Sequence, residues 1–153
     1  MSFATRLMVI GIVLTAAVLA GAVWLILRGR VRQSGSAEQI DLSTLGLPTG
    51  SFRGLGESAT LFLFSTDFCA TCPGVERAYL ELLATRPWAK LIKIDLTNRN
   101  DLAVRFHVLQ TPTTFVLNSH SNLVARIGGA PKLLALTKLL DDLAVGASHS
   151  YAI

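Results

Sequence analysis

A long apolar segment near the amino terminus is the strongest constraint on how this chain can fold. From Leu7 to Leu27 there is no ionisable side chain, and as a helix rising about 1.5 Å per residue the segment would span roughly 30 Å, the thickness of a bilayer core. A cleavable signal peptide is the alternative, with Arg6 as its basic flank and a small-residue site at 20–22. Its apolar region would usually stop after about 7–15 residues, whereas this one continues to Leu27. We therefore predict a short flank at 1–6 and an uncleaved transmembrane helix at 7–27.

The basic residues beside this segment predict its orientation. Arg28, Arg30 and Arg32 follow it, whereas only Arg6 and the terminal amine precede it. Because lysine and arginine concentrate on the cytoplasmic side, we expect a single-pass protein of the cell membrane with a cytoplasmic carboxyl-terminal domain; the extracytoplasmic placement stays open. The cluster also suits contact with the anionic lipid bilayer and contributes much of the net charge of +4. No basic face interleaved with aromatic residues follows, so nucleic acid is not an expected partner.

The remaining chain has room for one domain. Residues 28–40 are rich in charge, glycine and serine, which is typical of a linker. We assign 41–147 to the domain and 148–153 to a tail. The spacing of apolar residues between 40 and 47 predicts a short strand or turn that contacts the domain.

Hydrophobic periodicity within the domain predicts an α/β fold. Continuous or alternating apolar residues predict strands, and apolar stripes at helical spacing predict helices. The expected order is strand 59–64, a helix from the cysteines to about Thr85, strand 90–96, helix 101–106, strands 113–117 and 123–127 as a hairpin, and a helix from Pro131 to Gly146. This order predicts a mixed central sheet with helices on both faces.

The two cysteines, Cys69 and Cys72, carry the chemistry. A chain with only two cannot be a disulfide-rich secreted scaffold, so the pair must act locally. Disulfide exchange needs one cysteine that ionises readily and a second that resolves the mixed disulfide. The pair lies where a strand ends and a helix begins, and the amino terminus of a helix stabilises negative charge. We therefore predict Cys69 as the attacking residue and Cys72 as the resolving residue.

Strand, aromatic residue, Cys-Ala-Thr-Cys, helix, Thr-Pro-Thr, hairpin and Gly-Gly together resemble the thioredoxin superfamily over residues 57–145. The resemblance implies a three-layer thioredoxin-like sandwich behind one membrane helix, with a cis Pro112 against the disulfide. It also implies that Thr111 offers its backbone to the substrate and that Phe68 borders the same site. The family's usual buried acid and its lysine partner are replaced by Leu63 and Leu91. The redox potential and direction therefore stay open.

Asp67 and the cysteine pair each have alternative interpretations. Asp67 could assist proton transfer or be a loop or capping carboxylate. The cysteine pair could be half of a zinc site or could hold Cu(I), with a ligand drawn from His107, His120 or His149; it could also be idle in a scaffold protein.

The function that these residues favour is a membrane-tethered thiol–disulfide oxidoreductase that reduces protein or small-molecule disulfides. Its partners would be that substrate and an unidentified electron donor or acceptor, without a bound cofactor. A copper or zinc metallochaperone on the same fold is the alternative. If the domain lies outside the cytoplasm, disulfide formation or cytochrome maturation becomes the natural role.

Overall fold

A computed structural model describes residues 3–27, 31–33 and 55–150 of the chain. The predicted strand or turn between 40 and 47 lies outside these residues. The limits of the domain at 41 and 147 stay a prediction.

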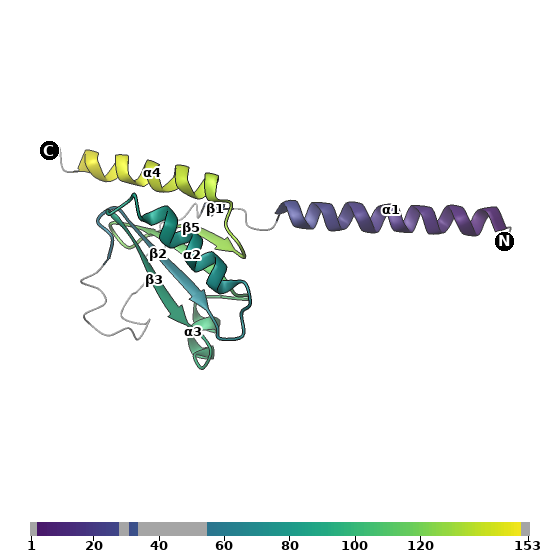
Figure 1. Ribbon diagram of the computed structural model, residues 1–153, viewed down its shortest axis with the longest axis horizontal. Helices are drawn as coiled ribbons and strands as arrows, with labels where there is room; N and C mark the ends of the chain where they lie inside the picture. The colour runs from purple at the N-terminus through teal and green to yellow at the C-terminus, as the bar shows by residue number, and fades with distance from the viewer. Residues whose placement is uncertain (1–2, 28–30, 34–54, 151–153) are drawn as a thin grey trace.

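The described domain is a mixed sheet with helices on both faces (Figure 1). The elements in chain order are α1 (Phe3–Leu27), β1 (Val31–Gln33), β2 (Ala59–Ser65), α2 (Cys72–Leu83), β3 (Ala89–Asp95), α3 (Asn100–Arg105), β4 (Thr113–Asn118), β5 (Leu123–Gly128) and α4 (Leu133–Ser150). The sheet order is β1-β5-β4-β2-β3, in which β2 and β3 are parallel and the other neighbours are antiparallel. The predicted order of elements from β2 to α4 and the terminal hairpin are confirmed.

Helix α1 is separate from this sheet in sequence and in composition. Within the described residues it is the one helix that is long and apolar enough to cross a membrane, as judged by length and composition alone. None of its window from Arg6 to Val23 is buried against the rest of the protein. A helix with apolar side chains exposed on all sides is what a lipid environment accommodates.

The structure differs from the sequence-based prediction at two places. Part of the predicted linker forms β1, which pairs antiparallel with the outer edge of β5. An edge strand offers a row of unpaired backbone groups, and three extended residues are enough to cover some of them. Helix α4 does not close at Gly146 but continues to Ser150. A single glycine inside a helix costs only about 1 kcal/mol, so it does not by itself end one.

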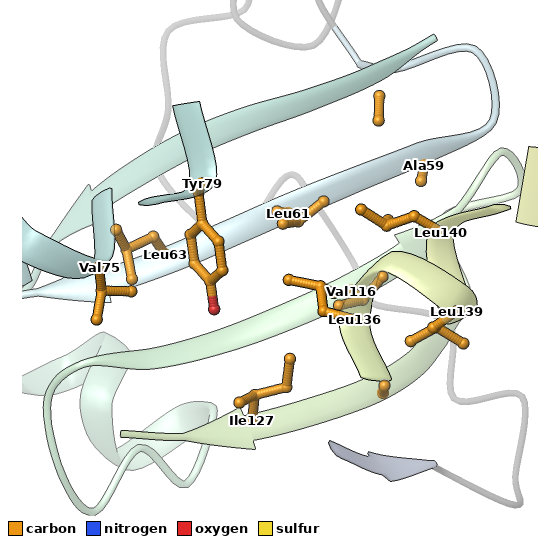
Figure 2. Packing of buried hydrophobic residues seen from close by; sticks show 12 residues of the cluster. Ala59, Leu61, Leu63, Val75, Tyr79, Val116, Ile127, Leu136, Leu139 and Leu140 are labelled. Atoms are coloured by element: carbon orange, nitrogen blue, oxygen red, sulfur yellow. The ribbon is translucent and has the colours of Figure 1, made fainter. Parts of the chain in front are cut away.

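The continuous apolar run of β2 is buried on both sides of the sheet, as predicted for a central strand. Leu61 and Leu63 pack with α2 and α4 on one face (Figure 2), whereas Phe62 and Phe64 pack near α3 on the other. Trp88 is partly buried against the first cluster. Two cores on one sheet hold the end of β2, and with it the cysteine loop, in a fixed place.

Tyr79 is the polar exception within the first core. Its side chain is fully buried, and its hydroxyl donates a hydrogen bond of 2.8 Å to Oγ1 of Thr114. Figure 2 shows the phenol reaching from α2 between the sheet residues. Burial raises the pKa of Tyr79 to about 12, and the hydrogen bond with Thr114 offsets part of that rise. This contact ties α2, which carries the second cysteine, to β4.

We expect Tyr79→Phe to lower the free energy of unfolding by about 1–2 kcal/mol at neutral pH, because the buried Thr114 hydroxyl loses its partner. In the wild type the unfolded chain releases the phenol proton near pH 10 and the folded chain only near 12. Between these two pH values the unfolded chain binds fewer protons than the folded chain. The free energy of unfolding therefore falls as pH rises from 10 to 12, by roughly 2–3 kcal/mol in total.

Urea titrations of the full chain in detergent micelles at several pH values, followed by near-ultraviolet circular dichroism, would measure both effects. The variant should lack the loss between pH 10 and 12. An identical alkaline loss in variant and wild type would contradict this account.

Candidate active site

The two cysteines form a disulfide at the start of α2, with their Cα atoms 5.4 Å apart. Cys72 is the first residue of the helix, and Cys69 lies in the loop that leaves β2. The amide of Cys69 donates to the carbonyl of Thr66 at 3.1 Å, and the amide of Cys72 donates to the carbonyl of Cys69 at 3.2 Å. The backbone of the loop thus folds back on itself and holds the two sulfur atoms together.

The two sulfur-bearing residues differ in access. Cys72 is only 3% exposed, whereas Cys69 is partly exposed at the surface. An incoming disulfide can therefore reach Cys69 but not Cys72. This asymmetry fits the predicted order of attack and resolution.

The surroundings of Cys69 favour negative charge on its sulfur. Pro73 occupies the first turn of α2, where its missing N–H removes no helical hydrogen bond, and the positive end of the helix dipole lies close to the cysteines. Oγ1 of Thr71 lies 3.7 Å from Sγ of Cys69. When the pair is reduced, this hydroxyl can donate to a thiolate at Cys69. Sequence reasoning did not assign Thr71 a role, although a hydroxyl between the two cysteines was a signal for one.

A second loop lies beside the cysteine loop. The Thr111–Pro112 peptide bond is cis, as predicted, and Pro112 is buried. Oγ1 of Thr111 is 3.4 Å from Oγ1 of Thr66, which joins this loop to the cysteine loop. The amide of Gly129 donates to the carbonyl of Pro112 at 2.7 Å, which brings in the connection between β5 and α4. The predicted substrate-binding residues therefore meet the cysteines at one end of the sheet.

Exposed apolar side chains border this meeting point. Phe68 is 89% exposed and Leu109, three residues before Pro112, is 95% exposed. Beside the disulfide lies a pocket of ≈ 370 Å³ lined by Ala70, Thr71, Gly74, Val75, Ala78, Ala130, Pro131 and Leu133. Phe68 was expected here from sequence, whereas Leu109 and the pocket were not, because their exposure depends on how distant loops meet. A rim of this kind can accept the apolar side chains around a substrate disulfide.

Leucines occupy the two positions where the family usually carries a buried acid and its lysine partner. Leu63 is fully buried, and Leu91 is partly buried against the same core. Asp67 is the acidic residue nearest to Cys69 in the sequence. Its side chain is exposed, and its backbone amide donates to Oγ1 of Thr97 at 3.0 Å. That hydroxyl donates to Asp95 at 2.6 Å; its hydrogen bond and that from the Thr97 amide lower the pKa of Asp95. A role of Asp67 in proton transfer stays a hypothesis.

A metal centre has no ready ligand set in the described part of the chain. No group of three or more histidine, cysteine, aspartate or glutamate side chains there is placed to hold an ion. His107 and His120 are both exposed. The side chain of His149 lies outside the described part.

Comparisons with known proteins agree with the geometry. A family model described as thioredoxin matches residues 55–142. Thioredoxin from Trypanosoma brucei brucei is similar in structure, with 22% sequence identity over 74% of this chain and 97% of that protein and a TM-score of 0.52. Mitochondrial thioredoxin 3 from Saccharomyces cerevisiae, in its oxidised form, is 23% identical over 61% of this chain and 88% of that protein, with a TM-score of 0.50. Among curated protein sequences, none matches.

Proposed function

This chain belongs to the thioredoxin family, and we propose from that premise that it exchanges disulfides with its partners through Cys69 and Cys72 while tethered to a membrane. Membership of this family confirms the prediction from sequence that the chain is a thiol–disulfide oxidoreductase. The observation that carries the proposal is the disulfide at the amino terminus of α2, with the accessible sulfur of Cys69 beside the cis Thr111–Pro112 loop.

The reaction is a pair of sulfur exchanges. In the reductive direction the Cys69 thiolate attacks one sulfur of a substrate disulfide, forms a mixed disulfide and releases the other substrate sulfur as thiolate. Cys72 then loses its proton to solvent and attacks Cys69, which closes the Cys69–Cys72 bond and releases the second substrate thiolate. Two electrons pass from the cysteine pair to the substrate, so no cofactor is required. A separate dithiol must then reduce the pair again.

Substrate contacts in this proposal come from the two loops beside the disulfide. Phe68 offers an exposed ring next to Cys69, and Thr111 offers backbone groups next to Pro112. Proline has no N–H, so Pro112 leaves the pairing of an extended substrate backbone to Thr111. Thr71 contributes a hydrogen bond to the Cys69 sulfur when it carries charge.

Reduction is the direction we propose, with the domain on the cytoplasmic side of the cell membrane. Helix α1 supports the tether by its length and composition, and the three arginines that follow it support a cytoplasmic domain. Cytoplasmic thiols are kept reduced, so a disulfide exchanger there works mainly as a reductase. In the extracytoplasmic alternative the same site would act as an oxidant or in cytochrome maturation.

The reduction potential of the full chain in micelles tests this proposal. The chain would be equilibrated against glutathione buffers, and zinc and copper would be assayed on the same sample. We expect a metal-free two-electron couple, with a reduction potential of about −270 mV for a reductase and about −120 mV for an oxidant. Failure to form the disulfide, or stoichiometric metal held by the thiols, would replace this proposal with the metallochaperone. The full chain is used because a fragment that begins after residue 33 would lack β1.

A further inference from the structure

The short strand β1 connects the membrane helix to the sheet and fixes which way the sheet points. Residues Val31 to Gln33 pair with Ile127 to Ala125 of β5 in antiparallel register. β5 is antiparallel to β4, and β4 is antiparallel to β2. Three reversals mean that β2 and β5 both run opposite to β1. Because β1 runs away from α1, β2 and β5 run back toward it.

The register places the entry of β1 in the half of the sheet that holds the redox site. Val31 pairs with Ile127, Ile127 with Thr114, and Thr114 with Leu63. Leu63 is two residues before the end of β2, and the loop with Cys69 follows directly. With neighbouring strands about 4.8 Å apart, this row crosses the sheet in roughly 14 Å.

The link between helix and strand is too short to let the domain move far from the membrane. Only residues 28–30 separate Leu27 from Val31, and a fully extended chain covers at most about 14 Å over that step. Figure 1 shows β5 ending on the side of the domain from which α1 extends. The end of the sheet where β2 and β5 finish, which carries the disulfide, therefore lies next to the point where the chain leaves the bilayer. We call this end the redox edge.

The most exposed large apolar side chains of the domain gather at the redox edge. Phe68 directly precedes Cys69, Leu109 lies three residues before Pro112, and Leu134, 86% exposed, lies in the first turn of α4 after the loop that contacts Pro112. Leu133 beside it lines the pocket next to the cysteines. Exposed apolar side chains gathered in one place mark a surface that a partner protein can bury, and the short link to α1 places this surface close to the membrane.

We propose that the redox site faces the bilayer, and that its exchange partner is a disulfide of an integral membrane protein held at the membrane surface. The inference rests on the proposed function and on α1 spanning the membrane. Lipid supplies no disulfide, so the occupant of the redox edge must be the protein that carries one. The exchange is the one described above: the Cys69–Cys72 pair is oxidised as the membrane protein's disulfide is reduced to two thiols.

Reporter disulfides at different heights would test this. The reduced full chain would be placed in phosphatidylcholine–phosphatidylglycerol vesicles with single-pass reporter peptides of the same orientation. One reporter carries a two-cysteine disulfide loop directly after its membrane segment; a second raises the loop on a helical spacer of about twenty residues, or roughly 30 Å. A third reporter is the same loop as a soluble peptide. The rate of a single turnover would be read by thiol alkylation.

A pair of matched insertions separates the role of β1 from that of linker length. A flexible Gly/Ser segment of about twelve residues is inserted either between Leu27 and Arg28 or between Gln33 and Ser34. The first insertion releases the redox edge from the membrane, whereas the second leaves β1 attached. We expect the wild type and the second variant to reduce the surface reporter at least about tenfold faster than the raised one, and the first variant to lose that preference.

The outcomes are distinct. Equal rates for surface and raised reporters in the wild type, or faster reduction of the raised one, would overturn the membrane-facing site while the oxidoreductase stands. The same preference in both insertion variants would also overturn it. No exchange with any reporter, including the soluble peptide, would refute the proposed function as well. The soluble peptide also verifies that each variant is folded.

Discussion

Replacing Cys69 with serine is expected to abolish disulfide exchange, with a loss of about a thousandfold or more, because removal of the attacking group leaves no route to the mixed disulfide. Cys72→Ser is expected to stop the reaction at a different point. Its Cys69 remains accessible and can attack, but nothing resolves the product. The substrate then stays covalently bound to Cys69. The two variants thus fail in ways that identify which sulfur acts first.

Exchange assays with a small aromatic disulfide, together with non-reducing gels of membranes that contain each variant, would measure this difference. Cys72→Ser should accumulate adducts that dithiothreitol releases, and Cys69→Ser should not. The double variant Cys69→Ser/Cys72→Ser is the control for non-specific capture. Equal adduct formation by both single variants would contradict the assignment of Cys69 as attacker.

Local features of the sequence were enough to predict most of the domain. The apolar run of β2, the amphipathic α2 and the turn after Asn118 each have a pattern that neighbouring residues determine. The redox pair could be predicted because strand, cysteines and helix are contiguous. The cis Thr111–Pro112 bond was predicted from a family resemblance rather than from physical pattern, and it is present.

Features that depend on distant pairing could not be predicted. β1 has only three residues and reads as linker, because its stability comes from the edge of β5 and not from its own composition. The exposure of Leu109 depends on how its loop meets the cysteine loop. The contact of Thr71 with the Cys69 sulfur is local, but it depends on the conformation of one turn, which the residue types alone do not determine. These are also the features that shape the site.

Two phenylalanines four residues apart offer the sharpest test of how the site is supported. Phe64 is 1% exposed, and its ring centroid lies 4.8 Å from that of Phe115 and 5.9 Å from that of Phe106. Phe68 is 89% exposed. We expect Phe64→Ala to lower the free energy of unfolding by about 3–5 kcal/mol, a large part of the stability of an ordinary domain. Phe68→Ala should change it by less than about 0.5 kcal/mol.

The two variants should also differ in how the rate of disulfide exchange depends on the substrate. Folded Phe68→Ala protein should exchange with a protein disulfide about fivefold more slowly, the factor for roughly 1 kcal/mol of lost contact, and with a small aliphatic disulfide at the wild-type rate. Phe64→Ala should slow both substrates equally, in proportion to its unfolded fraction. Urea titration and exchange assays on the same micelle samples would separate the two. Equal loss of stability in both variants would show that Phe68 supports the fold and would contradict its assignment to the substrate-contacting surface.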